Sequence, residues 1–216
     1  MTDNNKNFIK HVPNILTTGR LVLTGFFLWM ILISDNVSNR ARFIDIAFVF
    51  FVITGLTDIV DGYIARRFNA TSKYGRIVDP LADKILICGA YICFAIIGRP
   101  LLFGWSQSTL SAIHWGIVAV LIFRELSVTI IRQWAENRNF KFPASVYGKL
   151  KMFTQSFGVG TILVKMAHLE TAQWAYWFTA VTLSIMIFAT LVSGFEALFR
   201  MFIAVKDSKK PLVPSA

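Results

Sequence analysis

Long apolar runs separated by short polar connections are the main pattern along this chain. Each run approaches the ~20 residues that a helix needs to cross the hydrocarbon core of a bilayer. The expected membrane-spanning segments are residues 16–34, 44–64, 80–98, 111–131, 151–168 and 174–204. Backbone groups in lipid must all be hydrogen-bonded, and strands of this length and uniform hydrophobicity would not close a barrel. Six such runs therefore predict an all-α integral membrane protein.

The start of the chain is polar, and Phe8, Ile9 and Val12 recur there at helical spacing. A helix of this kind lies along a membrane surface with its apolar face in the lipid. We therefore expect a short amphipathic juxtamembrane helix over residues 4–14, ahead of the first span.

Positive charge falls on every second connection between the apolar segments and near both ends of the chain. Basic residues gather in residues 66–76, 132–151 and 200–210, whereas the alternate connections are poor in them or contain balancing acids. Since cytoplasmic loops carry an excess of Lys and Arg, we expect both termini in the cytoplasm. The expected organisation is one membrane domain over residues 1–205 and a disordered cytoplasmic tail at 206–216.

Composition supports the membrane assignment and limits the function classes. Of 216 residues, 55% are hydrophobic and 16% charged, whereas soluble domains carry about 25% charged residues. A net charge of +10 would suggest nucleic-acid binding in a soluble protein. Here the basic residues follow the membrane topology, so we expect no nucleic-acid partner. Cys88 and Cys93 match no zinc or redox spacing and are expected to be apolar core residues.

Four aspartates flank the connection between the second and third segments. Asp58 and Asp61 are three residues apart, and Asp79 and Asp83 are four apart, so each pair shares one face of its helix. A helical hairpin would bring all four to one depth near the cytoplasmic boundary. An Asp within a membrane helix costs about 2.5 to 3.5 kcal/mol, and a bound divalent cation would offset this cost and the repulsion between carboxylates.

Carboxylate oxygens favour hard ions such as Mg²⁺, Mn²⁺ or Ca²⁺ over zinc. The alternative is a structural network in which the acids pair with nearby basic residues, namely Arg66, Arg67, Arg76 and Lys84. An ionisable cluster inside a membrane is a functional-site hypothesis by default, so we favour a metal site. Gly62, Ala65 and Gly75 would let a ligand or a neighbouring helix approach the backbone closely.

These residues stand at the spacing of a known signature: Asp58-Ile-Val-Asp61-Gly62-Tyr-Ile-Ala65-Arg66, eight residues, Gly75, three residues, Asp79, three residues and Asp83. At all eight defining positions the chain resembles the CDP-alcohol phosphatidyltransferases. If each residue type has ~6% usage, eight chance matches have odds of roughly 10⁻¹⁰ per start position. The resemblance extends to that family's six helices with cytoplasmic termini.

The resemblance implies a role for each residue of the signature. The residues that would bind metal and the CDP diphosphate are Asp58, Asp61 and Asp79. Asp83 would be a further metal ligand and the general base. The residues that would contact the remainder of the CDP group are Gly62, Ala65 and Gly75, which make room for cytidine, and Arg66, which meets the diphosphate. The implied cofactor is Mg²⁺ or Mn²⁺, in a homodimer in the bacterial cytoplasmic membrane.

A second group of basic residues indicates the acceptor. Arg124 lies inside the fourth apolar segment, and Lys149 and Lys151 lie at the cytoplasmic start of the fifth. Such a patch suits an anionic acceptor, although for the two lysines the alternative is an ordinary basic flank. Glu125 is a candidate structural partner of Arg124, but adjacent helix positions point in different directions.

The stretches Arg124-Glu125, six residues, Arg132 and Gly148-Lys149-Leu-Lys151-Met-Phe-Thr-Gln155 resemble the phosphatidylglycerophosphate synthase branch of this family. So does the opening Val12-Pro13-Asn14-Ile15-Leu16-Thr17 with Arg20. That branch joins CDP-diacylglycerol to sn-glycerol 3-phosphate, which implies that Arg124, Lys149 and Lys151 hold the acceptor phosphate. Met152 departs from the branch, which usually has threonine there.

Two alternatives stay open. Within the family, the chain would be a phosphatidylserine, phosphatidylinositol-phosphate or cardiolipin synthase, against which the patterns at residues 124–132 and 149–155 argue. In another class, a cation transporter would place carboxylates along a path across the membrane, whereas these aspartates cluster at one end.

Overall fold

The computed structural model describes the backbone of residues 3–67, 73–138 and 145–208, and the side chains of residues 17–57, 78, 81–138, 145–203 and 205–206. Every regular element in these ranges is helical: α1 (Asp3–Ile33), the 3-10 turn η1 (Ser34–Asn36), α2 (Arg40–Arg67), α3 (Lys73–Ile97), α4 (Gln107–Asn137), α5 (Val146–His168) and α6 (Gln173–Ser208). The predicted all-α class is confirmed.

Two expected segments are parts of longer helices. The residues expected to form a separate surface helix, 4–14, are the first turns of α1, which runs without a break to Ile33. Helical hydrogen bonds that continue through this region keep the backbone paired where a loop would have to enter lipid. At the other terminus α6 continues through Ser208, and the rest of the predicted tail, residues 209–216, lies outside the described residues.

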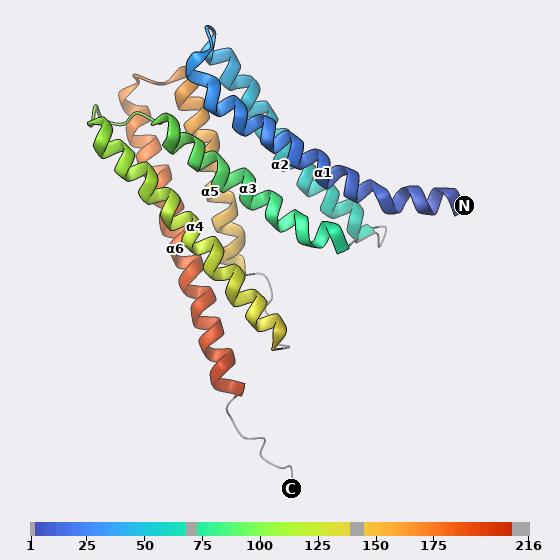
Figure 1. Cartoon of the computed structure of the whole chain (residues 1–216). Helices are drawn as coiled ribbons and strands as arrows, with labels where there is room; N and C mark the ends of the chain where they lie inside the picture. Colours follow the sequence, from blue (N-terminus) through green and yellow to red (C-terminus); the bar gives the residue numbers. More distant parts are fainter. Residues whose placement is uncertain (1–2, 68–72, 139–144, 209–216) are drawn as a thin grey trace.

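The helices run alternately in opposite directions between two ends of the molecule (Figure 1). Residues 34–39, 98–106 and 169–172 connect helices at one end, and the C-terminal ends of α2, α4 and α6 lie at the other. Packing of α1 on α2 and α3, of α5 on α2 and α6, and of α4 on α3 and α6 closes a ring. Toward the second end, α1, α2 and α3 diverge from α4, α5 and α6 (Figure 1).

Inward-facing apolar side chains form the core of this ring. Phe27, Met30 and Ile31 of α1 follow the spacing of one helix face, and each is at most 2% exposed. At Gly158 of α5 a Cβ atom would collide with the hydroxyl of Tyr91 on α3, so glycine is what allows these two helices to approach. The Tyr91 hydroxyl donates to the backbone carbonyl of Gln155 at 3.2 Å.

A serine caps the N-terminus of α4, which carries Arg124, and another caps α5, which carries Lys149 and Lys151. Ser106 accepts a hydrogen bond from the Thr109 amide at 3.3 Å, and Ser145 accepts one from the Gly148 amide at 3.0 Å. Such a cap satisfies an otherwise free helix N–H and is worth about 1 kcal/mol. The caps therefore determine where α4 and α5 start.

A network of four charged side chains joins the three connections at the first end. Arg40 contacts Glu170 and Asp35, each at 3.3 Å. Arg99 pairs with the same two acids, at 3.6 Å from Asp35 and in closer contact with Glu170. Two cations thus balance two anions, which explains how these connections contain arginines without an excess of charge.

The exterior of the ring is strongly apolar. Phe123 and Phe188, for example, are 74% and 70% exposed, as expected for a protein surrounded by lipid. Within the described residues, three stretches are long and apolar enough to cross a membrane: Thr17–Asn36, Gln107–Asn137 and Gln173–Ile203.

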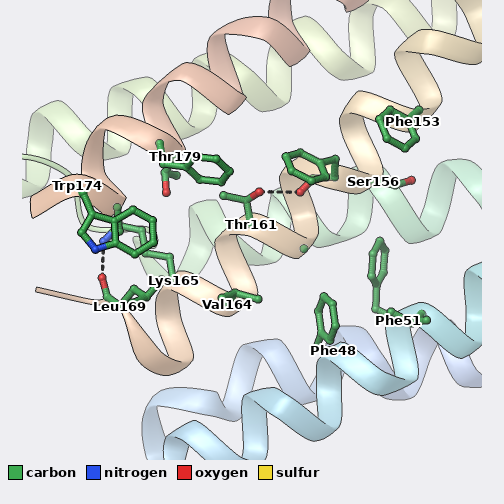
Figure 2. A pocket seen from close by; sticks show the side chains of 15 residues that line it. Phe48, Phe51, Phe153, Ser156, Thr161, Val164, Lys165, Leu169, Trp174 and Thr179 are labelled. Atoms are coloured by element: carbon green, nitrogen blue, oxygen red, sulfur yellow. Dashed lines mark hydrogen bonds between the residues drawn. The ribbon is translucent and has the colours of Figure 1, made fainter. Parts of the chain in front are cut away.

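An apolar groove of about 520 Å³ runs between α2, α5 and α6 (Figure 2). Six of its lining side chains are aromatic, namely Phe48, Phe51, Phe153, Phe157, Trp174 and Phe178. Lys165 lies at one end, where its ammonium donates to the backbone carbonyl of Glu170 at 3.1 Å. Among the predicted site residues whose side chains the structure describes, none lines this groove.

Candidate active site

The four aspartates lie on the two helices that flank residues 68–72. Asp58 and Asp61 are in the C-terminal part of α2, and Asp79 and Asp83 are in the N-terminal half of α3. The side chains of Asp58, Asp61 and Asp79 are outside the described residues, as are Gly62, Ala65, Arg66 and Gly75 beyond their helical backbone. Their joint metal and CDP site therefore stays a prediction.

Asp83 is the signature aspartate whose side chain the structure describes. It is 31% exposed, and one of its oxygens accepts a hydrogen bond from Nη1 of Arg20 at 3.4 Å. Arg20 itself is 1% exposed on α1. A buried cation requires a partner, and this contact brings the positive charge of α1 to α3, one of the two helices that carry the signature.

Sequence reasoning placed Arg20 in a family motif but gave it no position in the site. The available signal was an arginine within an apolar run. Such a residue is costly in lipid unless it faces the interior. Its partner on another helix could not be identified from local spacing.

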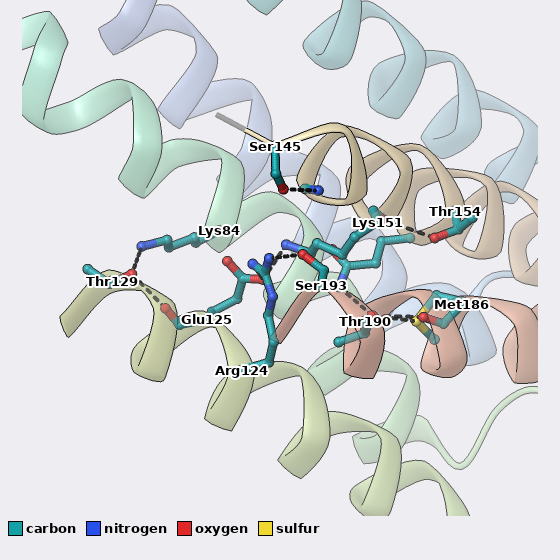
Figure 3. Close-up of polar contacts among 12 residues, drawn as sticks. Lys84, Arg124, Glu125, Thr129, Ser145, Lys151, Thr154, Met186, Thr190 and Ser193 are labelled. Atoms are coloured by element: carbon teal, nitrogen blue, oxygen red, sulfur yellow. Dashed lines mark hydrogen bonds and ion pairs between the residues drawn. The ribbon is translucent and has the colours of Figure 1, made fainter. Parts of the chain in front are cut away.

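The second cluster joins α4, α5 and α6 (Figure 3). Nη1 of Arg124 donates to Oε1 of Glu125 at 3.0 Å, and the Lys151 ammonium donates to the same oxygen. Nη2 of Arg124 donates to the hydroxyl of Ser193 on α6. The side chains of Arg124, Glu125 and Lys151 are only 11%, 12% and 7% exposed. The structure thus brings two predicted acceptor residues together in a group that is largely shielded from water.

The third predicted acceptor residue lies apart from them. Lys149 is exposed, and its side chain has no hydrogen bond or ion pair among the described residues. Positions two apart on a helix differ by about 200° around its axis. Lys149 and Lys151 therefore face opposite sides of α5, although both lie near the start of the helix.

The prediction of Glu125 as a candidate structural partner of Arg124 is confirmed, because Nη1 of Arg124 lies 3.0 Å from Oε1 of Glu125. Adjacent helix positions point in different directions, but the arginine side chain is long enough to reach the neighbouring carboxylate. Sequence reasoning missed Ser193. A serine in an apolar helix is equally typical of close helix packing, so no local signal marked it as a partner of Arg124.

A polar contact connects the helix of Asp83 to this basic cluster. Lys84, next to Asp83 on α3, donates to the hydroxyl of Thr129 on α4 at 2.5 Å. That hydroxyl in turn donates to the backbone carbonyl of Glu125 at 2.6 Å. Lys84, the neighbour of Asp83 in the chain, is therefore linked through Thr129 to the turn of α4 that carries Glu125 (Figure 3).

An all-helical, apolar fold with the aspartate signature on α2 and α3 and a buried basic group beside it defines a class of lipid-modifying enzyme. The chain belongs to the CDP-alcohol phosphatidyltransferase family, whose sequence model matches residues 10–202. The predicted family is confirmed.

Individual relatives narrow the comparison. The chain is 32% identical over 159 residues to the "Probable phosphatidylglycerophosphate synthase" of Mycobacterium tuberculosis H37Rv, covering 74% of this chain and 68% of the relative. It is 29% identical over 207 residues to the CDP-diacylglycerol–glycerol-3-phosphate 3-phosphatidyltransferase of Bacillus subtilis 168, covering 92% and 98% of the two chains. The Haemophilus influenzae protein with that same name is 30% identical over 155 residues, or 71% of this chain and 75% of the relative.

Proposed function

We propose that this protein transfers the phosphatidyl group of CDP-diacylglycerol to sn-glycerol 3-phosphate, which yields phosphatidylglycerophosphate and CMP. The observation that carries the acceptor assignment is the buried pair of Arg124 and Lys151. Cations at a shielded position favour a phosphate monoester over a neutral alcohol. The names of the bacterial relatives support the same pair of substrates.

The aspartates would hold a divalent cation, Mg²⁺ or Mn²⁺. The fit rests on the donor set, since carboxylate oxygens are the ligands that these ions prefer, and on the partial exposure of Asp83. Bound metal would neutralise the diphosphate and stabilise the departing CMP. Asp58, Asp61 and Asp79 would share this role with Asp83.

The remaining steps fall to side chains of this chain. Arg124 and Lys151 would orient the acceptor by its phosphate, with Lys149 as an outer contact. A hydroxyl oxygen of the acceptor attacks the phosphorus that bears diacylglycerol, the bond from that phosphorus to CMP breaks, and Asp83 takes the hydroxyl proton. Gly62, Ala65 and Gly75 would leave space for cytidine, and Arg66 would bind the diphosphate.

We further propose that all six helices span the bacterial cytoplasmic membrane, with both termini and the active site at the cytoplasmic face. The distribution of basic residues supports this orientation. In this arrangement the groove between α2, α5 and α6 opens to membrane lipids, which its aromatic lining suits. A homodimer is the expected oligomer by analogy with the family.

The test is a panel of acceptors offered to the purified protein with CDP-diacylglycerol and Mg²⁺ or Mn²⁺. We expect CMP release with sn-glycerol 3-phosphate, and none above background with serine, inositol phosphate or phosphatidylglycerol. Preference for any of the other three would reassign the chain within its family. Ion transport without CMP release would replace the enzyme assignment by a transporter.

A further inference from the structure

A buried carboxylate lies at the centre of the basic cluster, and the proposed reaction does not use it. Oε1 of Glu125 accepts hydrogen bonds from both Arg124 and Lys151 (Figure 3). At 12% exposure, the Glu125 side chain is nearly as shielded from water as its two partners. A single oxygen thus bridges the two cations that are assigned to the acceptor.

The charges explain why an anion is needed in this position. Two buried cations repel each other and have lost most of their hydration, so an unpaired pair would be strongly destabilising. With Glu125 the three side chains carry a net charge of +1, and without it they carry +2. The carboxylate therefore stabilises the cluster when no substrate is bound.

Arg124 and Lys151 have further hydrogen-bond donors that an incoming anion could accept. Nε of Arg124 is buried without a hydrogen-bond partner among the described residues. The Lys151 ammonium has three N–H donors, and the Glu125 carboxylate accepts one of them. A phosphate monoester carries close to two negative charges and more acceptor oxygens than a carboxylate, so it can replace the bridging oxygen and satisfy these donors.

We propose that Glu125 is a resident counter-anion, which bridges Arg124 and Lys151 in the substrate-free protein and is displaced by the phosphate of the acceptor. The inference rests on the proposed function, because it takes these two cations as the acceptor site. It adds a specificity rule: a doubly charged phosphate monoester can displace the carboxylate, whereas a neutral alcohol cannot.

The variant Glu125→Gln tests this exchange, because it removes the charge and retains the shape. Calorimetry on the purified full-length protein in detergent measures binding of inorganic phosphate and of sn-glycerol 3-phosphate. We expect both to bind roughly tenfold more tightly to the variant, since a charge-assisted hydrogen bond no longer has to be broken. The variant should also melt at a lower temperature without phosphate, and phosphate should raise its Tm by more than in the wild type.

Two further variants complete the design. Glu136→Gln makes the same charge change at an exposed position of α4 and should bind phosphate like the wild type. Glu125→Asp keeps the charge but shortens the side chain, so that it bridges the two cations less well. It should also bind phosphate more tightly than the wild type, by a smaller factor. If Glu125→Gln does not fold, this variant tests the displacement of Glu125 by phosphate.

The outcomes separate this inference from the proposed function. The inference would be overturned if the wild type binds phosphate and the Glu125 variants bind it equally or more weakly. Glu125 would then not compete with the phosphate. Absence of phosphate and glycerol 3-phosphate binding by the wild type would overturn the acceptor site itself, and the inference with it.

Discussion

At the residue scale, two pairs of charged side chains within the apolar helices connect different helices. Arg20 of α1 contacts Asp83 of α3, and Lys151 of α5 contacts Glu125 of α4. A buried charge that loses its partner is strongly destabilising. These contacts therefore explain how such residues persist in a chain of this hydrophobicity.

The contribution of Lys151 can be separated from that of Lys149. Lys151→Met approximately keeps the length of the side chain and removes its charge, so we expect the KM for the acceptor to rise by roughly tenfold or more. The KM for CDP-diacylglycerol should change little, because Lys151 is assigned to the acceptor. Steady-state CMP release with either substrate varied measures both constants.

Lys149→Met is the matched control, since it makes the same change on the exposed side of α5. Its effect on the acceptor KM should be clearly smaller. A larger effect at Lys149 than at Lys151 would show that the exposed lysine, and not the buried one, holds the acceptor phosphate.

At the element scale, the approach of α3 to α5 depends on the absence of a side chain at Gly158. Gly158→Ala would push its methyl group into the Tyr91 hydroxyl, and overpacking of this kind costs about 1–3 kcal/mol. We expect a lower Tm in detergent. The double variant with Tyr91→Phe should recover part of the loss, because the colliding oxygen is removed.

Gly116→Ala serves as the comparison, because a Cβ atom at this position of α4 meets nothing within 4 Å. Alanine is favoured over glycine in helices by up to about 1 kcal/mol. The Tm of Gly116→Ala should therefore be equal to or above that of the wild type. Similar losses at both glycines would refute a specific role for the contact between α3 and α5.

Features that depend on local spacing could be predicted from the sequence, and features that depend on tertiary contacts could not. The helices follow from apolar runs, and the placement of Asp83 on the same helix as Asp79 follows from spacing. Glu125 could be named as a candidate partner of Arg124 because it is adjacent in the chain. Ser193, the other partner, could not be named because it is 69 residues away.

At the scale of the whole molecule, the two ends differ in the charged residues that they carry. One end carries the aspartate signature and the buried basic residues, where the two groups of helices diverge (Figure 1). At the other end, ion pairs connect the loops, with two cations and two anions in the network: Asp35, Arg40, Arg99 and Glu170. We infer that this second end holds the ring closed while the first contains the reacting groups.

Glu170→Gln tests this division, because it removes the acid that contacts both Arg40 and Arg99. The network is partly exposed, so we expect a loss of about 1–2 kcal/mol in stability, and the loss should shrink at high salt. The KM for the acceptor should be unchanged, as the network lies at the opposite end. An altered acceptor KM in a folded variant would contradict this separation.

The central claim is that this chain joins a phosphate-bearing acceptor to the phosphatidyl group of a CDP-linked lipid. The most direct test incubates the purified protein with CDP-diacylglycerol, divalent metal and sn-glycerol 3-phosphate that is radiolabelled in its phosphate. We predict that label enters the lipid in a one-to-one ratio with CMP released, and that chelation of the metal stops both. CMP release without incorporation of label, or equal transfer to unphosphorylated glycerol, would contradict the account.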